Sequence, residues 1–396
     1  MSQADTTAAN RSEQPEQAPK EAPTPAPAPA STAPPRPSRP VYSQDDGQAE
    51  TENVLLMGID LGTSRSSIVA ADGTRKTVES YVGWPRDPIS RKHVGRDIVF
   101  GRMALEHRLS VELFRPLEHG VIKHTGEGDD DAETYRKNLE AAQALIHHVV
   151  SLAEPGRDEA LYAVVGAPAQ ASVRNKQAIL EAAQGVLDSV LICSEPFAVA
   201  YGLDRISDVL VIDIGAGTTD LCRMHGTMPH DDDQISLPVA GDAIDQKLWE
   251  LIRKNHPDAQ ISLHMCTQIK EQYGFVSSAQ DRIEVMIPVN GKPTKFDLTD
   301  EVKQACEIVI EPVLDSVHKL IASFDPAFQD KLRNNIILAG GGALIDGLNK
   351  RLEDGLERVG GGHVTVVDEP VYSGANGALQ LAHDMPPEYW QQVAAS

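Results

Sequence analysis

Two aspartates, Asp60 and Asp213, each follow an apolar run and precede glycine and small hydroxyl residues. The first stretch reads Leu-Leu-Met-Gly-Ile-Asp-Leu-Gly-Thr-Ser (55–64), and the second reads Val-Leu-Val-Ile-Asp-Ile-Gly-Ala-Gly-Thr-Thr-Asp (209–220). A carboxylate at the end of a buried strand can hold a hydrated Mg²⁺ ion, and glycine lets backbone N–H groups approach phosphate oxygens. Either copy alone could be a tight turn that ends a strand. Their repetition predicts a duplicated domain whose two loops face one polyphosphate.

Two other stretches place acidic or glycine residues where a strand meets a helix. In Ser194-Glu195-Pro196, the carboxylate can stabilise the start of the following helix. Gly340-Gly341-Gly342 follows an apolar strand, and we expect a helix from about Ala343. A strand, a glycine turn and a helix in this order are typical of an anion or nucleotide site at a helix N-terminus.

The elements that must position these residues alternate between strands and helices. Residues 66–71, 161–166 and 190–193 are short apolar runs typical of strands. Apolar residues at helical spacing predict a helix from near Ala132 to about residue 154, and a long helix over 301–324. This alternation predicts an α/β fold of layered sheets and helices.

Composition separates the first fifty residues from the rest of the chain and excludes several functions. Residues 1–51 are rich in Pro and Ala, which predicts a disordered tail without the apolar core of a secretion signal. The net charge of −22 argues against duplex nucleic acid as a partner. No apolar run approaches the roughly 20 residues that span a bilayer, and neither end contains an amphipathic anchor. Because identical copies repel each other, added salt or divalent cations should favour self-association.

Cysteines and a run of aspartates could suggest a metal site, but their spacing does not support one. The four cysteines lack a Cys-x-x-Cys pair, so we expect reduced thiols, with Cys193 and Cys222 in the core. The residues 231–233, Asp-Asp-Asp, follow a proline and are predicted to form a solvated acidic turn.

Five motifs occur in the order found in the actin, Hsp70 and sugar-kinase ATPase superfamily, which the chain after residue 52 resembles. The motifs are the two Asp-x-Gly turns and the residues 194–202, 269–274 and 339–342. Within that superfamily the chain is most similar to bacterial actins of the MreB group, and closer still to the magnetosome actin-like proteins. Residues 58–64, 194–197, 269–272 and 386–390 carry this likeness.

The resemblance implies an actin-like ATPase fold of two duplicated ribonuclease-H-like domains around a nucleotide cleft. It places the first domain at 52–207 with an insertion at about 82–130, and the second at 208–370 with an insertion at about 243–300. Residues 371–396 return to the first domain. The cleft is expected to bind ATP or ADP with Mg²⁺, which Asp60 and Asp213 would hold through water.

The same resemblance implies roles for individual residues. Glu195 is expected to orient the attacking water, with Asp213 as a second catalytic residue. The residues expected to contact the nucleotide are Asp60, Gly62, Thr63, Ser64, Gly215, Ala216, Gly217, Thr218, Thr219, Gly241, Asp242, Lys270, Glu271, Gly340, Gly341 and Gly342.

The implied function is a cytoplasmic filament that hydrolyses ATP and positions magnetosome organelles. Its partners would be further copies of itself and magnetosome-associated acidic or adaptor proteins, with no nucleic acid and no direct membrane anchor. Two alternatives share the fold: a membrane-associated actin relative, and a small-molecule kinase. An Hsp70-type chaperone is not expected, because about 55 residues follow Gly342 here and a large substrate domain would need more.

Overall fold

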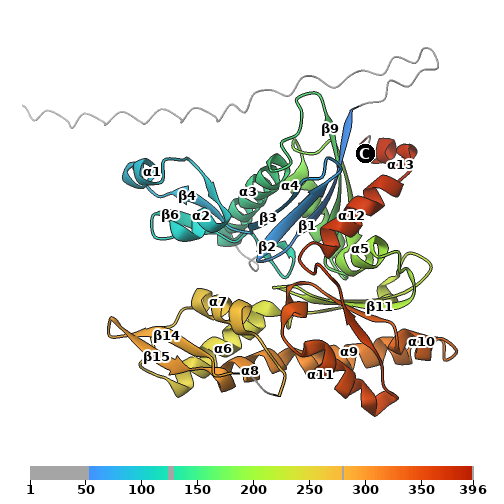
Figure 1. Cartoon of the computed structure of the whole chain (residues 1–396). Coiled ribbons are helices and arrows are strands. Elements are labelled where there is room, and N and C mark those ends of the chain that lie inside the picture. Colours follow the sequence, from blue (N-terminus) through green and yellow to red (C-terminus); the bar gives the residue numbers. More distant parts are fainter. Residues whose placement is uncertain (1–52, 124–128, 279–280, 395–396) are drawn as a thin grey trace, which may run out of the picture. The chain divides into compact units, whose positions relative to one another are not determined.

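The computed structural model describes residues 53–123, 129–278 and 281–394, and all of them belong to one compact unit, Thr51–Ser396 (Figure 1). The tail predicted over residues 1–51 lies outside the described residues, which begin at residue 53. Two five-stranded sheets form the framework of the compact unit.

The first sheet has the strand order β10-β9-β1-β2-β3. Its strands are β1 (Val54–Leu61), β2 (Arg65–Ala70), β3 (Arg75–Glu79), β9 (Ala160–Ala167) and β10 (Ser189–Ser194). β1 pairs antiparallel with β2 and parallel with β9, and β9 pairs parallel with β10. In this register Asp60 lies opposite Ser67 on one side and Gly166 on the other, at the carboxyl ends of the parallel strands.

The second sheet repeats this topology in the order β13-β12-β11-β16-β17. Its strands are β11 (Ser207–Ile214), β12 (Thr219–His225), β13 (Gln234–Leu237), β16 (Ile336–Ala339) and β17 (Val364–Val366). Asp213 pairs with Asp220 on β12 and with Ala339 on β16, so it occupies the position that Asp60 has in the first sheet. The predicted α/β fold with a duplicated domain is therefore confirmed.

Helices cover both sheets and fill the space between them. The helices of the first half and the C-terminal segment are α3 (Asp129–Ser151), α4 (Val173–Ala183), α5 (Glu195–Gly202), α12 (Ser373–Asp384) and α13 (Pro387–Ala394). Buried residues of α5 and α12 form one apolar cluster with β9 and β11, so these two helices join the sheets. At the close contacts Gly377 faces the Ala198 carbonyl and Gly58 faces the Ala375 carbonyl, where no Cβ would fit. Among the described residues no helix is both long and apolar enough to cross a membrane.

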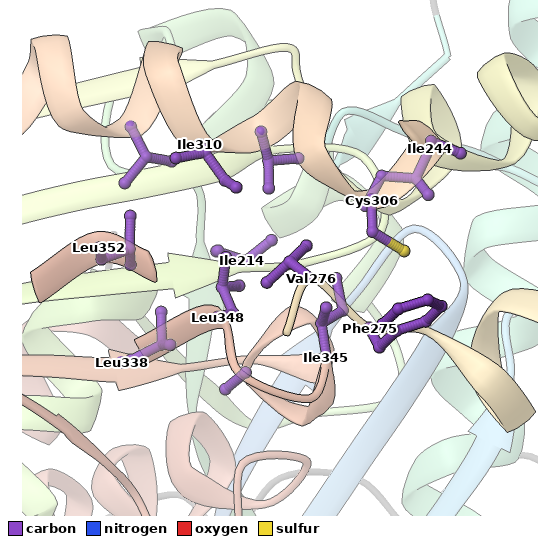
Figure 2. Close-up of a cluster of buried hydrophobic side chains, with 14 of the residues drawn as sticks. Ile214, Ile244, Phe275, Val276, Cys306, Ile310, Leu338, Ile345, Leu348 and Leu352 are labelled. Carbon is purple, nitrogen blue, oxygen red and sulfur yellow. The ribbon is translucent and has the colours of Figure 1, made fainter. Parts of the chain in front are cut away.

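The second sheet packs against a larger core. Its helices are α6 (Gly241–Asn255), α7 (Leu263–Tyr273), α8 (Thr299–Cys306), α9 (Ile310–Ala322), α10 (Gln329–Arg333) and α11 (Leu348–Leu356). Figure 2 shows how Ile214, at the end of β11, packs among Val276, Ile345 and Leu348. The apolar contacts behind this strand end hold the second Asp-x-Gly turn in place. Cys306 is one of four free, buried cysteines, and the core positions predicted for Cys193 and Cys222 are confirmed.

Two small additions extend from the halves. The first, which we call the small lobe, is a three-stranded sheet with two helices, spanning residues 82–114. Its elements are β4 (Val82–Pro85), α1 (Pro88–Val94), β5 (Val99–Phe100), α2 (Gly101–Glu106) and β6 (Val111–Phe114). A short hairpin of β7 (Leu117–Glu118) and β8 (Val121–Ile122) follows it, and a hairpin of β14 (Glu284–Val289) and β15 (Lys292–Asp297) extends the second half.

Two predicted helices differ from the structure. The helix expected over 301–324 is interrupted by a 3₁₀ turn at Glu307–Val309, and a new helix starts at Ile310. Pro312 lacks an N–H group, so it is tolerated in the first turn of a helix but not in the interior of a longer one. The helix expected from Ala343 begins only at Leu348, because the backbone of Asp346 pairs with residues 274–276 instead.

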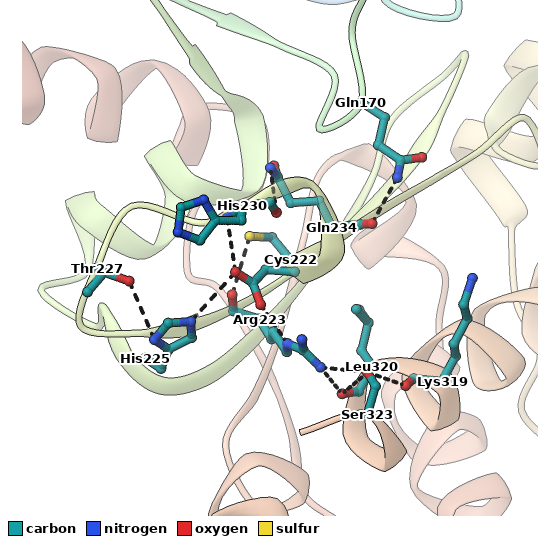
Figure 3. A network of polar contacts seen from close by, with 11 residues as sticks. Gln170, Cys222, Arg223, His225, Thr227, His230, Gln234, Lys319, Leu320 and Ser323 are labelled. Carbon is teal, nitrogen blue, oxygen red and sulfur yellow. Dashed lines mark hydrogen bonds and ion pairs between the residues drawn. The ribbon is translucent and has the colours of Figure 1, made fainter. Parts of the chain in front are cut away.

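The acidic turn at residues 231–233 was predicted to be fully solvated, and this is wrong for Asp233. Its carboxylate is buried and accepts a hydrogen bond from Nε of the buried Arg223 at 2.8 Å. Arg223 also donates to the carbonyl of Leu320 and to the hydroxyl of Ser323, each at 2.7 Å (Figure 3). This guanidinium therefore joins the end of β12 to the last turn of α9, where exposed carbonyls favour a cation.

Candidate functional site

A cavity of about 810 Å³ lies between the two halves, at the carboxyl ends of β1 and β11. Of the residues expected to contact a nucleotide, or to act on it, all except Thr219 line this cavity. The Thr219 side chain is buried and donates to the Val239 carbonyl at 2.7 Å, so it supports the turn from behind. Side chains from sequence positions more than 270 residues apart thus meet at one concave site.

The second Asp-x-Gly turn is joined by its backbone to the start of α6. The Gly215 N–H donates to the Thr218 carbonyl at 2.9 Å, which closes the turn. The N–H groups of Gly241 and Asp242 donate to the carbonyls of Gly215 and Ala216, at 3.1 and 2.7 Å. The N-terminus of α6 is therefore held beside the turn, and both expose backbone to the cavity. Turn amides and a helix N-terminus favour an anion.

Gly340 is required by both its conformation and its contacts. Its φ is 75°, and a Cβ there would overlap the Asp213 carboxylate and the Ile214 carbonyl. No helix begins directly after the glycine triplet, contrary to the prediction, because Gly341–Leu344 form a 3₁₀ turn. Gly340 therefore lets the backbone lie against Asp213, and the helices that begin at the cavity are α6 and, at Glu195, α5.

Four carboxylates gather beneath the cavity. Burial raises the pKa of Asp60 from its usual 3.8 to about 6. Burial, and then the neighbouring charges of Asp60 and Asp220, raise the pKa of Asp213 well above its usual range. For Glu195, burial and the charges of Asp60, Asp220 and Asp213 act in the same direction. A cluster of this kind disfavours its own ionisation and favours a cation or a shared proton.

The carboxylate cluster is compatible with a hydrated Mg²⁺ ion. No group of three or more His, Cys, Asp or Glu residues suited to direct metal binding exists within the described part of the chain. Mg²⁺ usually keeps several waters and takes one or two carboxylates together with substrate phosphates. Asp60 and Asp213, one from each half, provide that number of carboxylates at the cavity.

Lys270 lines the cavity, but its ammonium group already has protein partners. Its Nζ donates to the Gly241 carbonyl at 2.8 Å and lies 2.9 Å from Oδ1 of Asp245. Burial raises the pKa of Asp245, and the charge of Lys270 opposes that rise. Lys270 therefore fixes the start of α6 against α7. Its neighbour Glu271 is half exposed and lies 3.8 Å from Arg65 of the opposite half.

Arg115, which follows the small lobe, and the turn of the hairpin β7–β8 contact both Asp-x-Gly turns, and the sequence did not predict these contacts. Arg115 donates to the Thr63 carbonyl and to Oδ1 of Asp242, each at 2.9 Å. Nδ1 of His119 lies 2.7 Å from the Gly217 carbonyl, while the Gly120 N–H donates to the Thr63 hydroxyl at 2.8 Å. His119 has a φ of 49°, a conformation that is strained for a residue with a side chain. In the sequence, Glu118 and His119 before a glycine could have suggested a functional turn, but no nearby residue pattern relates this turn to either Asp-x-Gly turn.

Two sheets of the same topology, with an anion-binding cleft between them, define the actin-like ATPase fold. The family model described as MreB/Mbl protein matches residues 55–387, and the chain belongs to this family.

Within that family, the chain is similar to relatives and solved structures of one kind of actin-like protein, MamK. The chain is 38% identical over 348 residues to actin-like protein MamK of Paramagnetospirillum magneticum, covering 88% of this chain and 98% of the relative. MamK of Magnetospirillum gryphiswaldense is 39% identical over 348 residues, covering 88% and 94%. The solved MamK double helical filament is 38% identical and covers 84% of this chain and all of that chain, with a TM-score of 0.80. The structure of a non-polymerising MamK mutant bound to AMPPNP has a TM-score of 0.64 and also covers 84% of this chain and all of that chain.

Proposed function

We propose that this chain binds ATP with Mg²⁺ in the cleft, hydrolyses ATP to ADP and phosphate, and assembles into filaments when ATP is bound. The observation that carries the proposal is the convergence of both Asp-x-Gly turns, the start of α6 and the Gly340–Gly342 run on one cavity of about 810 Å³. Relatives that match over nearly their whole length are described as filaments, and one as bound to AMPPNP.

The two turns would hold the phosphates from opposite sides. Backbone N–H groups of 62–64 and 216–218 and the hydroxyls of Thr63 and Thr218 would donate to phosphate oxygens. Asp60 and Asp213 would hold the waters of Mg²⁺, and the ion, when bound, neutralises the charge of the phosphates. The base and ribose would lie between α7 and the 340–342 turn.

Glu195 is proposed as the residue that orients the attacking water. It begins α5 at the end of β10, and a Cβ on Gly166 would lie 3.2 Å from its Cγ, so it packs directly over the neighbouring strand end. The raised pKa of its carboxyl group makes it a stronger base than an exposed glutamate once ionised. Its carboxylate would accept a proton from water as the new oxygen–phosphorus bond forms and the bond to ADP breaks. Asp213 lies in the same cluster and is proposed to act with it.

Nucleotide would control assembly through contacts that cross the cleft. Arg115 to Asp242, His119 to Gly217 and Arg65 to Glu271 all join elements of different halves. Phosphates held by both turns would strengthen this closed arrangement, and hydrolysis would weaken it. The two sheets support the proposed domain limits at 52–207 and 208–370, and the contacts of α12 with β1 and of α13 with β10 support a return of residues 371–396 to the first domain. By likeness to MamK, the filaments would organise magnetosomes in the cytoplasm, with adaptor proteins as further partners.

The test is sedimentation with negative-stain microscopy of the purified chain in Mg²⁺·ATP, in ADP and without nucleotide. We expect filaments with ATP, together with phosphate release that needs no added acceptor. Asp213→Asn should lose both activities, while the exposed Asp258→Asn should retain both. Protein that stays in the supernatant with ATP would contradict filament assembly. ADP that forms only with a small-molecule acceptor, as the phosphoryl group moves to that acceptor without release of free phosphate, would contradict ATP hydrolysis and favour a kinase.

A further inference from the structure

A tight turn at residues 168–171, directly after β9, joins the first half of the molecule to the second. The Ala171 N–H donates to the Pro168 carbonyl at 3.0 Å, which closes the turn. Pro168 and Ala169 are buried, whereas Gln170 is exposed. We call these four residues the clasp turn, because the residues 168, 169 and 170 each contact a different part of the protein around the nucleotide cavity.

The side chain of Gln170 occupies the open edge of β13, the last strand on one side of the second sheet. Its Nε2 donates to the Gln234 carbonyl at 3.0 Å (Figure 3), and the Ser236 N–H donates to its Oε1 at 3.3 Å. A carbonyl and the N–H two residues further on are the two groups that a neighbouring strand would bind. The Gln170 carboxamide therefore takes the place of one residue of a further strand, and this residue comes from the other half.

The other two residues of the clasp turn lead to the cavity. The Ala169 N–H donates to Oδ1 of the buried Asp220 at 2.8 Å, and Asp220 pairs with Asp213 across β11 and β12. Directly opposite side chains of an antiparallel pair lie on the same face, so these two carboxylates are neighbours. Pro168 packs against Gly120, where no Cβ would fit, in the hairpin turn that contacts both Asp-x-Gly turns.

A contact of this kind is needed because the carboxylate cluster is divided between the halves. Asp60 and Glu195 belong to the first half, and Asp213 and Asp220 belong to the second. The charges of the other three act on the Glu195 carboxyl group, so the ionised groups repel one another across the boundary. That repulsion separates the halves at the point where the proposed hydrolysis requires them to be close.

We propose that Gln170 is a positioning residue for ATP hydrolysis. Its carboxamide joins the clasp turn to β13, and the clasp turn then fixes the distance between Glu195 in the first half and Asp213 in the second. Gln170 is not among the residues that line the cavity, so it acts through these groups and does not touch the nucleotide. The proposal rests on the proposed ATP hydrolysis and adds a residue on which its geometry depends.

Gln170→Met tests the contact in the full chain, because methionine has a similar length and makes neither hydrogen bond. We expect kcat for phosphate release to fall about tenfold, since small misplacements of reacting groups cost up to about 10² in rate. KM for ATP should stay within about twofold, because each Asp-x-Gly turn binds phosphate through its own backbone. Gln170→Glu keeps the acceptor for the Ser236 N–H but cannot donate to Gln234, so its kcat should be intermediate. Hydrogen exchange of residues 234–237 should be faster in Gln170→Met.

Gln143→Met is the matched control. Gln143 is also exposed and its Nε2 donates to a backbone carbonyl, that of Glu181 at 3.5 Å, but this bond joins α3 to α4 within the first half. The control should keep the wild-type kcat and KM, and thermal melting checks that each variant is folded.

Several outcomes would overturn the positioning role. They are a folded Gln170→Met variant with the wild-type kcat, an equal loss in the Gln143→Met control, and a rate that falls only in proportion to the protein that sediments with Mg²⁺·ATP. Wild-type protein that releases no phosphate from ATP would instead overturn the proposed hydrolysis, and the role of Gln170 with it.

Discussion

Replacing Asp60 by asparagine should stabilise the nucleotide-free protein while it removes activity. Burial raises the pKa of the Asp60 carboxyl from 3.8 to about 6, so the folded protein holds this proton more tightly than the unfolded chain does. The protonated Asp60 carboxyl therefore makes its full contribution to the stability of the folded state below pH 3.8, and that contribution is lost as the pH rises through about 6. At about pH 7.5 the ionised carboxylate costs the folded state about 3 kcal/mol, because one pKa unit corresponds to about 1.4 kcal/mol.

The size of the effect should depend on pH in a defined way. An uncharged amide of the same shape avoids the penalty, so the gain of Asp60→Asn in unfolding free energy should reach at most about 3 kcal/mol at about pH 7.5. At about pH 5 the wild-type carboxyl is largely protonated in the folded state, and the gain should fall to about half. Urea denaturation at both pH values measures this, with the exposed Asp258→Asn as a control expected to change stability by less than about 0.5 kcal/mol.

Ligand should remove most of the difference in stability between the wild type and the Asp60→Asn variant. Mg²⁺·ATP at about 100 times its Kd stabilises the wild type by about 2.7 kcal/mol, whereas a variant without the Asp60 carboxylate should gain little. A gain that is the same at both pH values, or a loss of stability at both, would refute the reasoning that burial of this charge is costly. Such a result would mean that hydrogen bonds to the Asp60 carboxylate outweigh its desolvation.

Three further substitutions test other parts of the site and the fold. Glu195→Ala should still bind ATP but release phosphate about 10²-fold more slowly, and wild-type turnover in that variant would exclude Glu195 as the water-orienting residue. Gly340→Ala should weaken ATP binding at least about tenfold, since its Cβ would overlap the Asp213 carboxylate at a φ of 75°; calorimetry showing unchanged affinity would contradict this. Arg223→Met should cost about 3–5 kcal/mol in urea denaturation by leaving the Asp233 carboxylate buried without the guanidinium beside it, whereas adding Asp233→Leu should recover most of the loss.

Much of the framework could be predicted because its signals are local. Apolar runs mark the buried strands, and the residues that follow each run mark the ends of those strands. Since parallel strands of one sheet end at the same edge, the repeated Asp-x-Gly turns were sufficient to place Asp60 and Asp213 at equivalent positions of two sheets. The break in the helix over 301–324 was also visible in principle, because Pro312 cannot donate a backbone hydrogen bond.

Local pattern did not reveal which side chains are already bound to other parts of the protein. Thr219 looked like a phosphate ligand, yet its hydroxyl is used by the Val239 carbonyl. Lys270 looked free for the nucleotide, but α6 supplies both of its partners. Asp233 looked solvated until the fold placed Arg223 beside it.

By itself, the sequence determined the strands, the paired turns and the acidic character of the chain, since these depend on residues close together in the chain. Only the tertiary structure decided that Arg115 and His119 join the two turns, and that the small lobe contacts β3 while α13 packs on β10 at the opposite edge of the same sheet. The physical reason is that burial, pairing and proximity are set by long-range packing, which brings together residues that no local spacing relates.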